Sequence, residues 1–304
     1  MSQSISPNVS VFKNAFEAID RRFVLFGIFP TVLLTVLLVI YPCYLVIQNS
    51  LYVDNPGIYN YVGFRQYLRI FNDPSFVIYL KHTLWYSGLT TTISFVVGMI
   101  LALCLNVNIR FRNLFRVWIL IPWAIPPVVS ALIFKWFFND IYGSANGLLT
   151  DLGIIAAPVA WLADKTYAMS ILIFCDTWIR IPFVTVVILA GLQTVPKDLY
   201  EAAKIDGAGE LLLFTRITLP CIKGAIFVAL LITSMFSFRE VSIMLTLTGG
   251  GPGDHTKLFA GYIYESAFRN LNFGFSSAMS VVMLLMIMVI TFTYFYLFKT
   301  EELG

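Results

Sequence analysis

Long apolar runs separated by shorter polar stretches dominate the pattern along the chain. Each run is long enough to cross the hydrocarbon core of a bilayer as a helix of roughly 20 residues. In lipid every backbone amide must bond within its own segment, and the alternation typical of barrel strands is absent. The pattern therefore predicts an all-α, polytopic integral membrane protein in which residues 23–299 form one domain with six transmembrane helices, at 23–48, 83–106, 114–138, 167–192, 222–247 and 276–299.

Composition agrees with a membrane protein and excludes several other classes. The 304 residues are 59% hydrophobic and only 12% charged, which is too few charges to cover a water-soluble surface. The formal net charge of +3 is small and the basic residues are scattered, so the chain lacks the basic patch of a nucleic-acid-binding protein.

The distribution of basic residues predicts that both termini are cytoplasmic. The inner segments would then carry Lys13, Arg21, Arg22, Arg110, Arg112, Arg116, Lys197, Lys204, Arg216 and Lys299, against Arg65, Arg69, Lys81, Lys165, Lys257 and Arg269 outside. Residues 1–22 form a cytoplasmic segment, for which an interfacial helix and a disordered tail both remain open, and 300–304 form a short cytoplasmic tail. The first apolar run is too long for a signal-peptide core, which predicts an uncleaved anchor.

The sequence contains no recognisable catalytic or metal-binding pattern. There are two histidines and four dispersed cysteines, with no HExxH or GxSxG motif. No GxxxxGK[ST] loop occurs, and the glycine-rich run at 249–253 has no lysine placed to reach a phosphate. We therefore expect that the chain is not an enzyme, that it binds no metal or cofactor, and that any ATP is hydrolysed by another protein.

Two features inside the predicted spans call for an explanation. Pro122, Pro126 and Pro127 remove backbone donors and predict a kink in the third span, as a packing feature or as a hinge. Asp176 and Arg180 lie one helical turn apart in the fourth span, which favours either an ion pair on one face or a polar lining of a solute path.

The segment between the fourth and fifth spans, residues 193–221, has the organisation of a short docked helix pair. Pro196 suits a first helical turn, Asp198 places negative charge near the helix start, and Gly207 supplies a flexible end. Small and apolar residues along the helix suit close contact with another protein. Pro220 is expected to end the second apolar stretch before the fifth span.

Several residues of this loop carry a specific resemblance. Seven residues have the spacing of the EAA loop of binding-protein-dependent ABC transporter permeases: Glu201, Ala202, Ala203, Gly207, Ile217, Leu219 and Pro220. The segment LTGGGPGDHT at 247–256 and the residues Trp178, Pro182 and Phe183 resemble the carbohydrate-uptake branch, the MalF-like permeases. The likeness covers roughly residues 167–256.

The resemblance implies a function and a set of partners. A MalF-like chain would be a permease subunit of an importer for a sugar, oligosaccharide or polyol in a bacterial or archaeal cytoplasmic membrane. It would assemble with a second homologous permease, two cytoplasmic ATPase subunits that bind ATP and Mg, and an extracytoplasmic solute-binding protein. The EAA helix would be the coupling helix that contacts the ATPase through Glu201, Ala202, Ala203, Asp206 and Gly207.

The same resemblance implies a solute path along the fifth span. Ser237, Arg239 and Glu240 match the stretch that lines the sugar site in MalF-like relatives, although relatives usually have an amide or aspartate in place of Arg239 and Glu240. Adjacent residues point apart, so these two cannot both face one cavity. Aromatic faces commonly hold sugars, which adds Trp178, Phe236 and Phe238 to Asp176 and Arg180.

Two other classes compete with the importer. An ion-coupled secondary transporter would use Asp176 or Glu240 as an ion site and would need no coupling helix. A structural or assembly protein would explain neither the intramembrane charges nor the docked loop. An accompanying ATPase chain would discriminate among all three.

Overall fold

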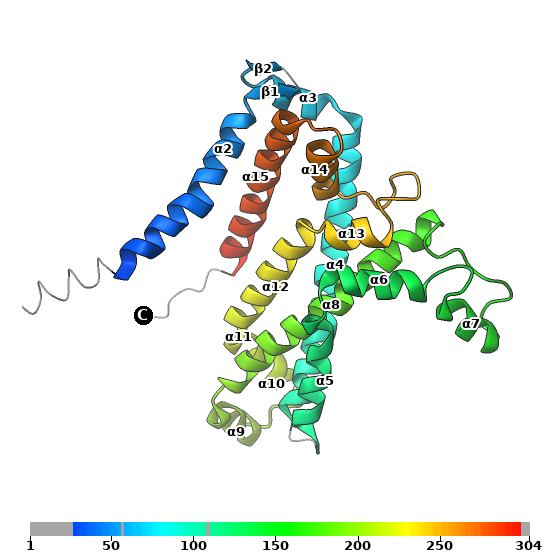
Figure 1. Ribbon diagram of the computed structural model, residues 1–304. Coiled ribbons are helices and arrows are strands. Elements are labelled where there is room, and N and C mark those ends of the chain that lie inside the picture. Colours follow the sequence, from blue (N-terminus) through cyan, green and yellow to red (C-terminus); the bar gives the residue numbers. More distant parts are fainter. Residues whose placement is uncertain (1–26, 56–57, 108–109, 299–304) are drawn as a thin grey trace, which may run out of the picture.

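The computed structural model describes residues 27–55, 58–107 and 110–298, and most of them are helical (Figure 1). The predicted N-terminal segment at 1–22 and the tail at 300–304 lie outside the described residues.

Four helices are long and apolar enough to cross a membrane. They are the helix Gly27–Asn49, which contains η1 (Val36–Ile40) and α2 (Tyr41–Asn49), together with α4 (Pro74–Asn106), α8 (Lys165–Gln193) and α15 (Phe273–Leu297). Two sharply bent helix pairs raise the number to six if each pair is one span. The described residues thus contain four to six candidate spans.

Side-chain caps fix where three of these helices begin. Asp73 accepts a hydrogen bond from the Ser75 amide (2.9 Å) at the start of α4, and Asp164 does so from the Thr166 amide (2.8 Å) at the start of α8. Asn272 accepts from the amide of Phe275 (3.2 Å) at the start of α15. A cap satisfies amides that have no partner within the helix. Helix α4 therefore starts nine residues before the predicted apolar run, because Asp73 and Pro74 begin it outside the most apolar part.

The proline cluster breaks the third predicted span. Helix α5 (Arg112–Ala124) ends before Pro126, and α6 (Pro127–Phe137) leaves at an angle of 92° (Figure 1). Pro122 is accommodated inside α5. The predicted kink is confirmed, and its cause is the pair of adjacent prolines, which lack the amides needed to continue the helix.

The fifth predicted span is not one helix, which corrects the prediction of a continuous run over 222–247. Helix α12 (Lys223–Phe238) ends at Phe238, and α13 (Ser242–Leu247) starts after a short break. At its other end α12 follows α10 (Glu210–Leu213), η2 (Phe214–Thr218) and α11 (Leu219–Cys221) with a bend of 69°. Pro220 lies inside α11, so the chain turns at Ile222 rather than at the proline.

Helices α4, α8 and α12 pack together and form the centre of the molecule. Two glycines allow this close approach. A Cβ at Gly98 of α4 would lie 2.6 Å from Cγ1 of Val184, and one at Gly191 of α8 would lie 2.6 Å from the Cβ of Ala225. Both distances are well below van der Waals contact, so the three helix axes can approach this closely because these residues have no side chain.

The remaining elements surround this centre. A two-stranded antiparallel hairpin, β1 (Tyr52–Asn55) and β2 (Ile58–Tyr61), and α3 (Arg65–Asn72) lie at one end, and α9 (Lys197–Ile205) lies at the opposite end (Figure 1). Helices α7 (Ser144–Asp151) and α14 (Phe259–Phe268) follow α6 and α13. Helix α2 contacts α15, but in the apolar window of helix Gly27–Asn49 no residue is buried, so much of the surface of this helix is available to lipid or to another chain.

Candidate functional site

A buried ionic network joins α8 to the break between α12 and α13. Arg180 donates from Nε to Oδ1 of Asp176 at 2.8 Å and from Nη2 to Oε2 of Glu240 at 3.1 Å. Asp176 is fully buried and Glu240 is 8% exposed. The ion pair expected within α8 is confirmed, and the structure adds Glu240 as a second carboxylate on the same guanidinium.

The same carboxylates also organise the backbone. Ser237 donates from its hydroxyl to Oδ2 of Asp176 at 3.1 Å, and Oε1 of Glu240 accepts from the amide of Ile243 at 2.9 Å. That second bond satisfies an amide at the start of α13. A buried carboxylate bonded both to an arginine and to an amide in the first turn of α13 helps to fix where that helix begins after the break.

A neighbouring cavity of about 330 Å³ lies where both broken helices meet α8. It combines apolar and aromatic walls with a few polar groups, the composition typical of a small-molecule site. Its lining comprises Trp123, Ile125, Pro127, Ile179, Arg180, Phe183, Thr233, Phe236 and Glu240.

Three of the eight predicted pathway residues line this cavity, namely Arg180, Phe236 and Glu240. The guanidinium carbons of Arg180 and Arg239 lie 5.1 and 4.7 Å from the centre of the Phe236 ring, and Arg239 is exposed while Glu240 is buried. The expectation that these adjacent residues point apart is confirmed.

The other predicted aromatic residues are placed elsewhere. Phe238 is 1% exposed and packs in a core cluster with Phe76 and Phe259. Trp178 packs edge-to-face on Phe134 at 5.4 Å, away from the cavity lining. Trp123 and Phe183 were not predicted from the sequence to lie on the solute path, although both line the cavity and their rings lie 6.2 Å apart. The proline cluster beside Trp123 was the available signal in the sequence for a cavity here, since it marks where the helix of the third span is broken.

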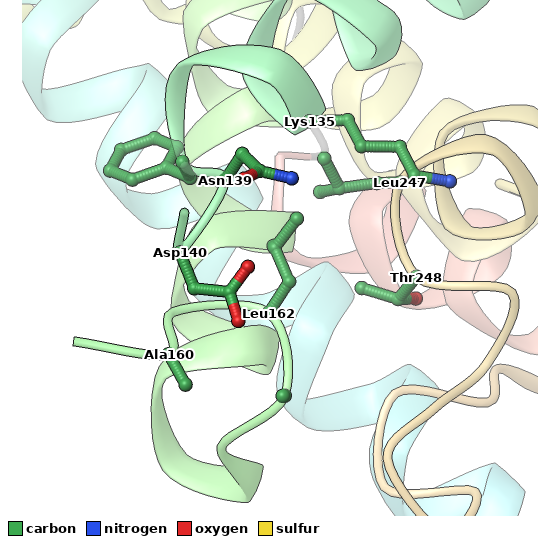
Figure 2. Close-up of a pocket in the computed structure, with 9 residues that line it drawn as sticks. Lys135, Asn139, Asp140, Ala160, Leu162, Leu247 and Thr248 are labelled. Carbon is green, nitrogen blue, oxygen red and sulfur yellow. The ribbon is translucent and has the colours of Figure 1, made fainter. Parts of the chain in front are cut away.

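A second cavity of about 280 Å³ lies between α6, the segment before α8 and the end of α13. Figure 2 shows Asn139 and Asp140 on one side and Lys135 and Thr248 on the other. Lys135 donates from Nζ to the backbone carbonyl of Thr246 at 3.1 Å, which ties α6 to α13.

A partly buried ion-pair network holds the loop after α13. Lys257 bridges Oδ1 of Asp254 and Oε2 of Glu265, both at 2.9 Å. The hydrogen bond from Lys257 holds the pKa of Asp254 below its ordinary value, against the opposing effect of partial burial. Burial by itself would lower the pKa of Lys257, but the hydrogen bonds to Asp254 and Glu265 outweigh it and raise that pKa. The network clamps the glycine-rich loop onto α14.

The loop at 193–221 forms a short helix that offers an open surface. Helix α9 follows Pro196, which is its N-cap rather than part of its first turn, and Gly207 after the helix has φ of +81°, a conformation that favours glycine. Glu201, Ala202, Asp206 and Gly207 are exposed and Ala203 is half-buried.

Anchoring contacts hold α9 in place while leaving that surface free. The hydroxyl of Tyr200 lies 3.0 Å from that of Thr218 on η2, and Val195 and Leu213 are buried. Ile205 is 86% exposed, so this surface presents a large apolar side chain beside the small ones. The surface is therefore suited to contact with another protein.

Comparisons with known proteins agree with these features. Residues 94–300 match the model of a family described as the binding-protein-dependent transport system inner membrane component. Relatives include the sulfoquinovosyl glycerol transport system permease protein SmoG of Agrobacterium fabrum, 33% identical over 86% of this chain and 85% of the relative. The trehalose/maltose transport system permease protein MalF of Thermococcus litoralis is 37% identical over 72% of this chain and 74% of the relative.

A solved structure has the same fold. A chain of a bacterial ABC transporter involved in the import of the acidic polysaccharide alginate superimposes with a TM-score of 0.79, covering 95% of this chain and 99% of that one at 24% identity. The family match extends over more than half of the sequence, and two relatives exceed 30% identity over most of their length. The chain therefore belongs to the family of inner membrane components of binding-protein-dependent transport systems.

Proposed function

We propose that this chain is a transmembrane permease subunit of an ATP-driven importer for a sugar, oligosaccharide or polyol. The observation that carries the proposal is the similarity over most of the chain to permeases named for trehalose/maltose and sulfoquinovosyl glycerol transport. A bacterial alginate ABC transporter that contains a chain of the same fold was crystallised in complex with an alginate pentasaccharide-bound periplasmic protein, which supports an external binding protein as partner. ATP and Mg bind to separate ATPase subunits.

The proposed architecture has six spans with both termini cytoplasmic. Each bent helix pair then counts as one span, and the loop at 193–221 faces the cytoplasm. The exposed face of α9 with Glu201, Ala202, Ala203, Asp206 and Gly207 docks onto an ATPase subunit. Closure of the ATPase dimer moves the spans because α9 is tied to η2 through Tyr200 and Thr218.

The proposed solute route passes the cavity of about 330 Å³ at the two helix breaks. Phe236 supplies an aromatic face for a sugar ring, and Arg239 adds an exposed guanidinium beside it. A second homologous permease would complete the path from the opposite side. Because Arg180 already bonds to both Asp176 and Glu240, neither carboxylate is arranged as the ion site of a secondary transporter.

Co-purification from the native membrane in mild detergent tests the assembly. The expected result is recovery of a second permease and an ATPase with the chain. The assembled importer in proteoliposomes, supplied with its binding protein, is then assayed for ATP-dependent uptake of trehalose, maltose and sulfoquinovosyl glycerol. Purification of the chain without an ATPase, together with uptake driven by an ion gradient, would refute the proposal.

A variant tests the coupling surface separately. Glu201→Arg reverses a charge on the exposed face of α9, and Thr215→Arg is its control on the exposed face of η2. The first is expected to retain assembly and lose uptake per ATP hydrolysed, while the second keeps both. Normal coupling in the Glu201 variant would refute the proposed docking of α9 onto the ATPase, but it would not contradict the assignment of the chain to an importer.

A further inference from the structure

A third cavity, of about 240 Å³, lies between α4, α5 and α8 at the end of the bundle that carries α9. Its walls are largely aliphatic and include Leu105, Ile119, Leu120 and Leu189. Two polar side chains line it as well, Arg116 from α5 and Gln193 from the last turn of α8. The cavity is therefore amphipathic, with an apolar body and a polar, cationic part.

The guanidinium of Arg116 is the unusual feature of this cavity. Its Nε and Nη2 atoms are buried and hydrogen-bond to no protein atom among the described residues. Nor does Arg116 form an ion pair within the part of the chain that the structure describes. Buried donors normally have partners, and a buried charge without one is costly. A cation held this way is suited to bind an anion from outside the chain.

The positive charge around this cavity favours a group with a full negative charge, such as a phosphate. Arg112 lies one helical turn before Arg116 in α5, and the first turn of that helix contains no acidic residue. Arginine binds phosphate oxygens with two parallel hydrogen bonds, which matches the two donors of Arg116 that are buried. Gln193 offers an amide that can donate to the same group.

We propose that this cavity binds the phosphate headgroup of an anionic membrane phospholipid. The phosphate diester would bond to Arg116 and Gln193, and the acyl chains would run along Leu120 and the exposed face of Val186. Basic pockets between transmembrane helices are a recognised setting for lipid headgroups. The membrane itself supplies this ligand because the chain belongs to an inner membrane family. The inference does not depend on the solute.

Native mass spectrometry of the full-length chain, in the assembly in which it purifies, tests the proposal. Dioleoyl phosphatidylglycerol and dioleoyl phosphatidylcholine are titrated separately, and inorganic phosphate is added in a third arm. We expect phosphatidylglycerol to bind at least about tenfold more tightly than phosphatidylcholine. Both lipids carry a phosphodiester that can accept charge-assisted hydrogen bonds, but the choline cation of phosphatidylcholine cancels the net charge of its headgroup and repels the guanidinium of Arg116. Arg116→Gln should abolish this preference.

Two further variants keep the result interpretable. Arg110→Gln removes the same charge from an exposed position outside the cavity and should bind phosphatidylglycerol within about twofold of the parent chain. Val186→Trp fills the cavity from its exposed side and should weaken binding while Arg116 remains, which covers the case that the Arg116 variant misfolds.

Three outcomes would overturn the proposal. Equal binding of the two lipids would show that the headgroup charge is not recognised. An equal loss of phosphatidylglycerol affinity in the Arg110 and Arg116 variants would show that the preference arises from general surface charge and not from this cavity. Competition by inorganic phosphate at millimolar concentration, with no preference for the lipid, would assign the site to free phosphate.

Discussion

Replacing Arg180 by methionine leaves Asp176 and Glu240 as two buried carboxylates with no counter-charge. The parent arginine bonds to them at 2.8 and 3.1 Å, whereas Ser237 and the Ile243 amide supply only neutral donors. Removing one partner of a buried ion pair typically costs about 3–5 kcal/mol, since the remaining charge stays desolvated. We expect a loss of that size in the free energy of unfolding.

Two companion variants separate charge from packing. The triple variant Asp176→Asn, Arg180→Met, Glu240→Gln removes all three charges, and it should recover most of the stability, because neutral groups of similar shape replace the network. Arg239→Met removes the neighbouring guanidinium, which is exposed and stacks on the same Phe236 ring. It should cost only about 0.5–1 kcal/mol.

Equilibrium unfolding of the purified full-length chain in mixed micelles, followed by tryptophan fluorescence, measures all of these differences. The expected order of stability is parent, Arg239 variant, triple variant and Arg180 variant. A single Arg180 variant as stable as the parent would refute the view that the guanidinium neutralises both carboxylates. A triple variant no more stable than the single one would assign the loss to packing instead.

Three further outcomes are expected. Gly191→Ala should lose about 1–3 kcal/mol in the same unfolding assay, because its Cβ would meet α12 at 2.6 Å, whereas Gly88→Ala, with open space around its Cβ, should be neutral or slightly more stable. Glu201→Arg should leave the free energy of unfolding within about 0.5 kcal/mol of the parent while uptake per ATP falls, since the side chain is exposed. The extra thermal stability of the parent over Lys257→Met should stay constant from neutral pH down to about pH 5 and shrink below the ordinary Asp254 pKa of 3.8. A carboxylate with a lowered pKa stabilises the fold only while it is charged, so a difference that grows in acid would contradict the ion pair.

The apolar pattern could locate the helices but not all of their ends. Predicted boundaries at 167 and 276 lie within a few residues of α8 and α15 because apolar length decides those spans. The start of α4 was predicted too late, since its first turns contain polar residues and depend on the Asp73 cap. The hairpin β1–β2 was not predicted, because four-residue strands in a loop give little periodic signal.

The candidate site was likewise predictable from the sequence only where local geometry determines it. The Asp176–Arg180 pair follows from spacing on one helix, which local geometry determines. The contribution of Glu240, 60 residues away from Arg180, depends on how α12 ends against α8. The burial of Phe238 and the exposure of Phe236 likewise depend on which side of α12 faces α4 and α15.

By itself the sequence determined that the chain is a helical membrane protein, where its apolar helices lie, that prolines interrupt the third one, and that an EAA-like loop follows the fourth. These are local properties, set by hydrophobic length, missing backbone donors and residue spacing. Only the tertiary structure decided that the fifth apolar run breaks at Glu240 and that two carboxylates share one arginine. It also decided that two guanidinium nitrogens of Arg116 are buried with no hydrogen-bond partner among the described residues. Those features arise from contacts between distant segments, and a buried charge is stabilised or left unpaired according to which groups the packing of the helices brings to it.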